Sequence, residues 1–342
     1  MNNESQQAVQ LLVPELSSII QLRYRILQTI AVAGPIGRRM ILETLNISER
    51  TVRNEMTLLN NQNLIETTQK GVICTSKGYE ILEELKETFQ EVSGLSKKEK
   101  NLAEILGIKK VIIVPGDVNS DSSSQQLLGK EASEYLMKIA KKDFTVAITG
   151  GSTVATLTNF LSPTKSLSTF TFVAARGSLG NEMNLQANTL VSQFASKCGA
   201  DFRTLYLPEN LSETAFATMI QEPIVKEVLD LYDHIDIVIH GIGTAKEMAH
   251  RRDSNESIIK MLNEKNAVGE AFGYYFDEAG EIIYRINTIG IQLEQVKQSP
   301  HILAVAGGSL KAKAIQAYFK NETAPQTILI TDEGAANAIL EN

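Results

Sequence analysis

The spacing of apolar residues near the start of the chain is that of a helix. Leu12, Leu16 and Ile19 follow one another at steps of four and three residues, and similar steps continue beyond them, which predicts a helix within residues 5–33. Pro14 lies inside this segment and is expected to kink or divide it, because proline cannot donate a backbone hydrogen bond. The sequence "AGPIG" then ends the helical pattern.

Two further helical patterns follow, separated by a short turn. "RRMILETLN" predicts a short helix, "ISE" the turn, and "ERTVRNEMTLLNNQNLI" a helix that directs Val52, Met56 and Leu59 inward. Ser48 is expected to cap the second helix, because its hydroxyl can accept a hydrogen bond from a backbone N–H one turn later. The two segments together predict a helix–turn–helix.

A hairpin and a further helix complete the N-terminal pattern. "LIETTQKGVICT" predicts two short strands about a "QKG" turn, in which Gly71 supplies the left-handed backbone. "SKGYEILEELKETFQEV" predicts a helix capped by Ser76. Because this order of elements is that of a winged helix, we assign residues 1–92 to a winged helix-turn-helix domain. The polar stretch 93–101 is expected to be a linker, and residues 93–342 are assigned to a second domain.

From residue 111 onward, short apolar runs alternate with helical patterns. Continuous apolar strands between helices indicate an α/β domain, with a doubly wound, mostly parallel sheet covered on both faces. Such a sheet binds ligands at the carboxyl ends of its strands, where the chain order switches. Strands are predicted at 111–115, 144–149, 169–175, 202–207, 236–240, 301–307 and 327–331, and helices at 125–141, 153–161, 184–198, 212–233, 244–251 and 309–320.

Composition and charge narrow the classes of protein. The 342 residues carry a formal net charge of −7, so the chain as a whole is no basic nucleic-acid binder. Residues 23–53 nevertheless hold six arginines and two glutamates, a local net charge of +4. Cys74 and Cys198 show no CxxC or metal-ligand spacing and are expected to be buried, unpaired thiols. Neither an apolar run of 18 residues nor a secretory signal is found, so we expect a cytoplasmic protein.

Seven polar side chains are candidates for contacts with DNA. The first turns of a recognition helix face base edges, where arginine can bind guanine and asparagine can bind adenine. Cations on the preceding helix and at the hairpin tip suit phosphates. The candidates are Arg50, Thr51, Arg53 and Asn54 for bases, and Arg38, Arg39 and Lys70 for phosphates. Alternatively, these residues form the solvated surface of a small protein-interaction domain.

A glycine-rich turn follows the predicted strand 144–149. "TGGST" places Gly150 and Gly151 where the backbone can approach a ligand closely. Ser152 and Thr153 then stand at the start of a helix, whose partial positive charge favours an anion. The segment lacks the lysine of a Walker A motif, which argues against nucleoside triphosphate chemistry. By itself it could also be only a tight turn between a strand and a helix.

Three other predicted strand ends carry cations, amides or glycines. They add Arg176, Gln186, Arg251 and Lys311 to the candidate ligand contacts. Because the carboxyl ends of parallel strands meet at one edge of a sheet, these side chains are expected to surround one site. Such a site could hold two phosphates, or one phosphate and a sugar.

Catalytic groups are sparse in this sequence. His240 ends a predicted strand and could act as an acid or base, or could simply pack beside the sheet. Glu270 and Asp332 are candidate carboxylates without an evident partner in the sequence, and Ser152 is not in a G-x-S-x-G motif. No metal-ligand spacing is found. Binding is therefore favoured over catalysis.

The motifs "AITGGST", "VAARGSLG", "IHGIGTAKEMAHRR", "VAGGSLKAKAIQAYF" and "LITDEGAA" resemble those of the SorC-type, DeoR-related transcriptional regulators that respond to sugar phosphates. The resemblance extends over nearly the whole chain, and "EPIVKEVL" and "NAVGEAFGYYF" resemble the branch that controls central glycolytic genes in low-GC Gram-positive bacteria. It implies a repressor of an operon for triose-phosphate enzymes, with fructose-1,6-bisphosphate as inducer and no cofactor. It also implies an effector domain related to glucosamine-6-phosphate deaminases and ribose-5-phosphate isomerases, and tetramers built from dimers on a long operator.

The resemblance assigns ligand contacts to particular residues, namely Ser152, Thr153, Arg176, Gln186, Arg251, Glu270 and Lys311. Ser152 departs from the threonine expected of the family but keeps a hydroxyl. After "GIG" the related deaminases carry an acidic residue and a catalytic histidine, whereas this chain has Thr244, Ala245 and Lys246. That difference argues against an enzyme.

Two alternatives stay open at this point. One is a sugar-phosphate isomerase or deaminase with an accessory DNA-binding domain. The other is a repressor of the same fold that responds to a different sugar phosphate, such as a deoxyribose or pentitol phosphate.

Overall fold

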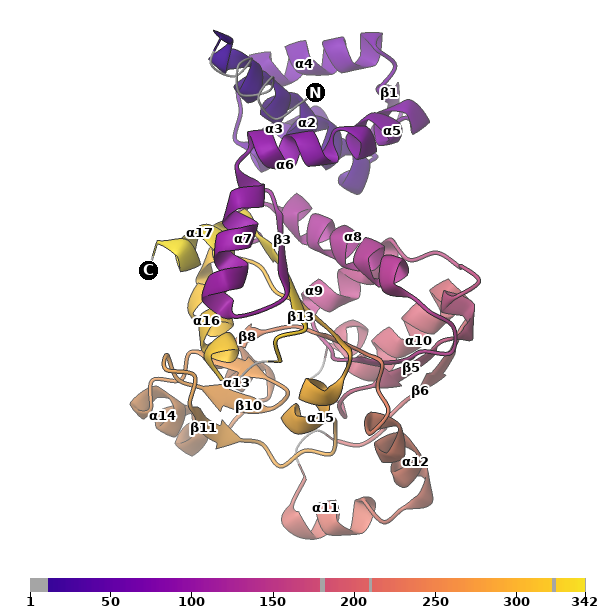
Figure 1. The fold of residues 1–342 in the computed structure, drawn as a ribbon, viewed down its shortest axis with the longest axis vertical. Helices are drawn as coiled ribbons and strands as arrows, with labels where there is room; N and C mark the ends of the chain where they lie inside the picture. Colours follow the sequence, from indigo (N-terminus) through magenta and orange to yellow (C-terminus); the bar gives the residue numbers. More distant parts are fainter. Residues whose placement is uncertain (1–11, 179–181, 209–210, 322–323, 342) are drawn as a thin grey trace. The chain divides into compact units, whose positions relative to one another are not determined.

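The chain divides into two compact units in the computed structural model, which describes residues 12–178, 182–208, 211–321 and 324–341 (Figure 1). One unit consists of residues 1–100 and 120–126, and the other of residues 101–119 and 127–342. Helices α7 (Leu95–Leu106) and α8 (Ser122–Ile139) each contribute residues to both units.

The N-terminal unit packs helices around one antiparallel hairpin, in the order predicted from the sequence. Ile26, Ile41, Val52 and Leu59 are among its buried apolar side chains. Its elements are α2 (Pro14–Ala33), α3 (Arg38–Leu45), α4 (Glu49–Asn61), β1 (Ile65–Thr68), β2 (Gly71–Cys74), α5 (Ser76–Glu84) and α6 (Lys86–Val92). Gly71 begins β2 with a φ of +136°, which supports the predicted need for glycine at the turn.

Hydroxyl side chains cap two of these helices. Ser48 accepts a hydrogen bond from the Thr51 backbone N–H at 3.1 Å, so the predicted cap of α4 is confirmed. The predicted cap by Ser76 is wrong, because Thr75 caps α5 by accepting from Gly78 N–H at 3.1 Å and Ser76 is the first helical residue.

Two predictions for the N-terminal third can be checked against the structure. Pro14 divides the predicted helix, which is one of the two expected effects: Leu12 is helical, Val13 is not, and Pro14 begins α2, where the first helical position needs no intrahelical N–H donor. Residues 5–11 of the predicted helix lie outside the described residues. The expected linker 93–101 is mostly helical, because Leu95 and Leu102 are buried on one side of α7. Its lysines and glutamate masked the helical spacing of these leucines.

The second unit is built on a seven-stranded sheet in which all neighbouring strands are parallel. The strands stand in the order β3-β13-β12-β7-β4-β5-β6. They are β3 (Lys110–Val114), β4 (Thr145–Ile148), β5 (Thr171–Ala174), β6 (Asp201–Arg203), β7 (Ile237–His240), β12 (His301–Val305) and β13 (Thr327–Asp332). All residues of β7 and β13 are buried, so helices cover both faces, as predicted.

Helices connect the strands at nearly all the expected places (Figure 1). They include α9 (Ser152–Thr156), α10 (Ala187–Cys198), α13 (Ala245–Arg251) and α16 (Ala312–Lys320). Helix α17 (Glu333–Leu340) follows the last strand and was not predicted. The single helix predicted at 212–233 is wrong, because Pro223 starts a new helix and the region forms α11 (Glu213–Met219) and α12 (Pro223–Tyr232). The strand predicted at 202–207 is limited to the three residues of β6.

A small antiparallel sheet was not predicted from the sequence. It consists of β8 (Gly243–Thr244), β9 (Gly269–Ala271), β10 (Tyr274–Phe276) and β11 (Ile282–Arg285). Helices α13 and α14 (Glu256–Glu264) pack against it through Ala245, Ala249, Leu262 and Tyr275, and α15 (Leu293–Gln298) follows it in the chain. Among the residues that the structure describes, none of the helices combines the length and apolar composition needed to cross a bilayer.

Candidate functional site

A pocket lies at the carboxyl ends of β4, β5, β7 and β12 and is closed on one side by the small sheet. Its volume is about 790 Å³ including the open mouth. Strand order reverses here, because the chain runs outward from β4 through β5 to β6 and then returns to β7 on the other side of β4. This strand-end pocket is therefore where an open α/β sheet is expected to bind a ligand.

All nine candidate ligand contacts from the sequence line the strand-end pocket. They come from segments as far apart as β4 and β12 and are brought together by the common edge of the sheet. The nine are Gly150, Gly151, Ser152, Thr153, Arg176, Gln186, Arg251, Glu270 and Lys311.

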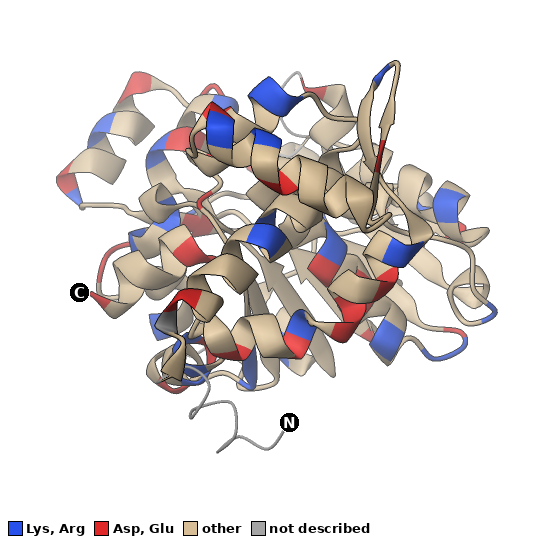
Figure 2. Cartoon of the chain, turned by 90° about the horizontal axis from the view of Figure 1, so that it is seen from above, with Lys and Arg blue, Asp and Glu red and all other residues tan. Residues whose placement is uncertain are grey.

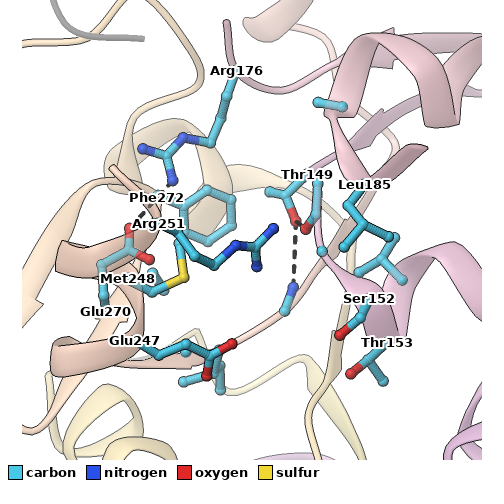
Figure 3. Close-up of a pocket in the computed structure, with 18 of the residues that line it drawn as sticks. Thr149, Ser152, Thr153, Arg176, Leu185, Glu247, Met248, Arg251, Glu270 and Phe272 are labelled. Carbon is cyan, nitrogen blue, oxygen red and sulfur yellow. Dashed lines mark hydrogen bonds and ion pairs between the residues drawn. The ribbon is translucent and has the colours of Figure 1, made fainter. Parts of the chain in front are cut away.

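The glycine turn forms one wall of the pocket. A Cβ atom on Gly150 would lie 2.4 Å from the carbonyl oxygen of Leu185, and Gly151 has a φ of +126°, so neither position suits a larger residue. Ser152 and Thr153 open helix α9 on this wall, where their hydroxyls flank the pocket (Figure 3). The Thr149 hydroxyl accepts from Gly241 N–H at 3.3 Å and thereby joins the turns that follow β4 and β7.

A buried charge cluster forms the opposite wall. Glu270 Oε1 accepts hydrogen bonds from Gly273 N–H at 2.5 Å, from Arg252 Nη2 at 2.9 Å and from Arg176 Nη1 at 3.2 Å. The three charged side chains are each less than 10% exposed, at 9% for Arg176, 5% for Arg252 and 3% for Glu270. The predicted carboxylate at 270 thus has two cationic partners, and one of them, Arg252, was not predicted.

The pKa values in this cluster follow from burial and from charge. Burial and the neighbouring charge of Arg252 lower the pKa of Arg176 to about 10, against the opposing effect of Glu270. Burial alone would raise the pKa of Glu270, but the charges of Arg252 and then Arg176 outweigh it and hold that pKa below its usual value. Burial lowers the pKa of Arg252, but the charge of Glu270 raises it by more, so that the pKa lies above its usual value. All three groups are therefore charged at neutral pH.

Arg251 reaches into the centre of the pocket, between Phe272 and Met248 on one side and Ser152 and Thr153 on the other (Figure 3). Its side chain is 24% exposed, and its Nη2 lies 3.7 Å from Glu182 Oε2, which is 68% exposed. A pair at that distance in partial solvent is weak, so an incoming anion can replace the glutamate.

Lys311 is presented by a loop that a buried carboxylate, a half-buried carboxylate and an amide hold in place. Asp332 Oδ2 accepts from Gly308 N–H at 2.8 Å and from Val118 N–H at 2.7 Å, and its Oδ1 accepts from Ala335 N–H at 2.8 Å. Asp117 Oδ1 accepts from Ser309 N–H at 3.1 Å, and Asn119 Oδ1 accepts from Leu310 N–H at 3.1 Å. Asp332, a candidate acid or base in the sequence, therefore anchors this loop.

The candidate DNA contacts lie on the surface of the N-terminal unit. Arg38, Arg39, Arg50, Arg53, Asn54 and Lys70 are exposed and Thr51 is half-buried. Val52, Met56 and Leu59 fill the opposite side of α4, so its polar side is free to face another molecule. Arg39 pairs with Glu43 at 2.8 Å and Arg53 with Glu49 at 3.0 Å, both along one helix. Figure 2 shows basic and acidic residues interspersed over the helices of the chain.

Comparisons with known proteins agree with both halves of this arrangement. Residues 90–341 match the family model "Putative sugar-binding domain", and residues 19–89 match "CggR N-terminal DNA binding domain". The chain is 40% identical to the central glycolytic genes regulator of Bacillus subtilis over 99% of both chains. The chain belongs to the SorC family of transcriptional regulators.

Further relatives extend the comparison. The central glycolytic genes regulator of Priestia megaterium is 40% identical over 97% of this chain and 96% of its own. The solved structure of a "putative SorC family transcriptional regulator from Enterococcus faecalis" is 39% identical, with a TM-score of 0.66 over 71% of this chain and 99% of its own. The full-length sorbitol operon regulator SorC from Klebsiella pneumoniae shares the fold, with a TM-score of 0.63 at 16% identity over 94% of this chain and 99% of its own.

This SorC family member is a DNA-binding regulator with a sugar-binding domain and not an enzyme, as predicted. His240 is fully buried, with its Nδ1 3.1 Å from Gly241 O and its Nε2 3.4 Å from the Tyr318 hydroxyl. Burial lowers its pKa to about 4, although Gly241 and Glu270 oppose the shift. A neutral, enclosed imidazole fits the packing interpretation of this residue.

Four residues in or beside the pocket were missed in the sequence. Glu247 and Met248 line it from α13, and Phe272 lines it from the turn between β9 and β10. Phe272 has a φ of +53°, rare for an aromatic residue, and its ring packs 4.7 Å from that of His240. The glycine at 273 was a signal for this turn, but Arg252 gave none, because nothing in the sequence separates its role from that of Arg251.

Proposed function

We propose that this SorC family member represses an operon for triose-phosphate enzymes and is induced by fructose-1,6-bisphosphate. The observation that carries the proposal is the placement of cationic and hydroxyl groups on two opposite walls of one pocket. Ser152, Thr153 and Lys311 would hold one phosphate of the effector. Arg176, with Gln186 and Arg251, would hold the other.

The chemistry of the second wall suits a phosphate. Arginine presents a planar fork that binds phosphate oxygens in a bidentate manner, and both Arg176 and Arg251 line the pocket. The acidic groups of the lining, Glu247 and Glu270, can accept hydrogen bonds from sugar hydroxyls. Glu270 Oε1 is already shared by three donors, so Glu247 is the more accessible acceptor.

The relatives support the biological context. Two proteins named central glycolytic genes regulators match this chain over nearly its full length. In our proposal the protein acts in the cytoplasm as a homo-oligomer, a dimer of dimers, that binds operator DNA through α4 and the β1–β2 wing of a winged helix. The effector can shift the assembly only through a difference in its affinity for the DNA-bound and released arrangements.

Calorimetric titration tests the two-walled site. Fructose-1,6-bisphosphate is expected to bind at least about tenfold tighter than fructose 6-phosphate, because a monophosphate leaves one wall without an anion. Arg251→Ala should remove most of that preference, and Thr153→Ala should weaken both ligands. Lys246→Ala, on the same helix as Arg251 but outside the pocket lining, is the matched control and should change neither.

Equal affinity of the wild-type protein for the two sugars would contradict the bisphosphate site. Tighter binding of another phosphosugar in a thermal-shift panel would instead identify a different inducer for the same pocket. A ligand at 100 times its dissociation constant stabilises the folded state by about 2.7 kcal/mol, which such a panel detects readily. Sedimentation of the operator complex with and without the effector tests the proposed change of assembly.

A further inference from the structure

Arg251 and Arg252 are neighbours in the sequence but face different surroundings. Arg251 lines the strand-end pocket and is 24% exposed. Arg252, at the C-terminal end of α13, is outside that lining and 5% exposed. It donates to the Tyr275 hydroxyl at 3.1 Å, and its guanidinium carbon lies 5.7 Å from the centre of the Tyr275 ring. Arg252 is thus fixed behind the pocket wall, where a ligand does not reach it.

Arg252 and Arg176 share one carboxylate oxygen. Arg252 Nη2 lies 2.9 Å from Glu270 Oε1, and Arg176 Nη1 lies 3.2 Å from the same atom. Of these two arginines, only Arg176 also lines the pocket. The three side chains together carry two positive charges and one negative, and the shorter contact belongs to the arginine outside the pocket lining.

We propose that Arg252 is a positioning residue for the effector site, which neutralises Glu270 and so leaves the charge of Arg176 available to an anionic ligand. This inference rests on the proposed phosphate site. Without Arg252, Arg176 alone balances the negative charge of Glu270. An incoming phosphate then meets a neutral ion pair and not a net positive charge. The pKa of Arg252 is raised because the charge of Glu270 outweighs the effect of burial, which agrees with this pairing.

A double-mutant cycle separates this role from ordinary packing. Arg252→Met keeps the length of the side chain but removes its charge, and Glu270→Gln removes the charge that Arg252 neutralises. With Glu270 intact, Arg252→Met is expected to weaken fructose-1,6-bisphosphate binding at least about tenfold, because charges this close in a buried site interact strongly. In the Glu270→Gln background, the same substitution should change binding by less than about twofold, because Arg176 keeps its charge without help.

Each outcome of the cycle has a definite meaning. A wild-type protein that does not bind the bisphosphate contradicts the proposed function. A wild-type protein that binds, combined with equal losses from Arg252→Met in both backgrounds, overturns the inference alone and assigns Arg252 to packing. Arg203→Met, which breaks the exposed pair with Glu227, is the matched control and should leave binding unchanged.

If thermal unfolding shows that Arg252→Met does not fold, a second measurement tests the inference. Glu270→Gln alone should tighten the binding of inorganic phosphate at least about threefold, because the negative charge of Glu270 then no longer competes with the anion for Arg176. Arg252→Lys, which keeps the charge, should hold bisphosphate affinity within about threefold of wild type. Unchanged or weaker phosphate binding by Glu270→Gln, or loss of bisphosphate binding by a folded Arg252→Lys, overturns the inference.

Discussion

The arginines of α4 and those of the strand-end pocket use the same chemical group in opposite surroundings. On α4, Arg53 is 63% exposed and pairs with Glu49, which is 73% exposed. At the pocket, Arg176 in the wall and Arg252 behind it are 9% and 5% exposed and share Glu270. An exposed pair is worth at most about 1 kcal/mol and is screened by salt, whereas a buried pair is costly to break.

The difference suits the ligands proposed for the two surfaces. A protein that searches along DNA benefits from cations whose partners are easily exchanged for phosphates, at any sequence. A pocket that must recognise one metabolite benefits from cations held in one geometry, because little has to reorganise when the ligand arrives. Four predictions, ordered from the largest expected effect to the smallest, test this contrast.

The largest effect should follow from breaking the buried cluster. Arg176→Met is expected to lower the free energy of unfolding by about 1.5–3 kcal/mol, because Glu270 loses a charge-assisted hydrogen bond although Arg252 still neutralises it. It should also abolish detectable effector binding. Urea unfolding gives the first value and calorimetry the second. Arg203→Met, in the exposed pair with Glu227, should cost less than about 0.5 kcal/mol; equal losses from the two substitutions would remove the contrast.

The next largest effect is a pH dependence of the free energy of unfolding, which tests the pocket side of the comparison. His240 has a pKa of about 4 in the folded protein, because it is buried, against about 6.5 in an unfolded chain. The unfolded state therefore binds a proton that the folded state does not, and the free energy of unfolding should fall by up to about 3 kcal/mol as the pH drops from about 6.5 to about 4.

The measurement is urea unfolding at several pH values. His240→Asn removes the titrating group and should flatten this part of the stability profile, even if its stability is lower at every pH. His234→Asn, at an exposed position, should leave the slope as in wild type. A wild-type slope in the His240 variant would assign the acid sensitivity to other groups.

A smaller effect is expected at the DNA surface. Arg50→Ala or Arg53→Ala should weaken operator binding by about 1–3 kcal/mol and relax the preference at one base position each, as for an arginine that contacts guanine. Fluorescence anisotropy with single-base operator variants measures both effects, and thermal unfolding should show an intact fold. Lys260→Ala, in an exposed helix pair far along the chain, is the control. Unchanged operator affinity in both arginine variants would exclude α4 as the recognition helix.

The smallest effect should come from the phosphate contacts. Arg38→Ala or Lys70→Ala is expected to weaken binding to all DNA sequences alike and to reduce the slope of log affinity against log salt by about one unit. Fluorescence anisotropy titrations at a series of salt concentrations measure this slope. Effector affinity should be far less sensitive to salt than operator affinity, since the pocket cations are buried or half-buried. Equal salt slopes for the two ligands would show that burial does not distinguish the two surfaces.

The sequence predicted which residues line the pocket better than it predicted the ion pairs among them. Gly150, Arg176 and Lys311 could be grouped because each follows a predicted strand of one parallel sheet, and such strands end at one edge. Arg252 could not be separated from Arg251, because which of two adjacent arginines turns inward depends on how α13 packs on the small sheet. That sheet has strands of only two to four residues, too short for a periodic pattern.

In the N-terminal unit, predictions made from short stretches of sequence were limited in a similar way. Ser48 was a reliable cap because a single hydroxyl precedes a clear helical pattern, whereas Thr75 and Ser76 offer two adjacent hydroxyls and only the structure distinguishes them. The polar composition of 93–101 suggested a linker, although the burial of Leu95 and Leu102 makes it part of a helix.

The Asp332 carboxylate joins three separate segments of the chain, and this affects how their backbone amides open to solvent. One carboxylate accepts from the backbone N–H groups of Val118, Gly308 and Ala335, so a loop after β3, the loop before Lys311 and the start of α17 share one anchor. Amide hydrogens that depend on one acceptor become open to solvent together. These three amides, separated by as many as 217 positions in the chain, should therefore exchange with deuterium as one cooperative group.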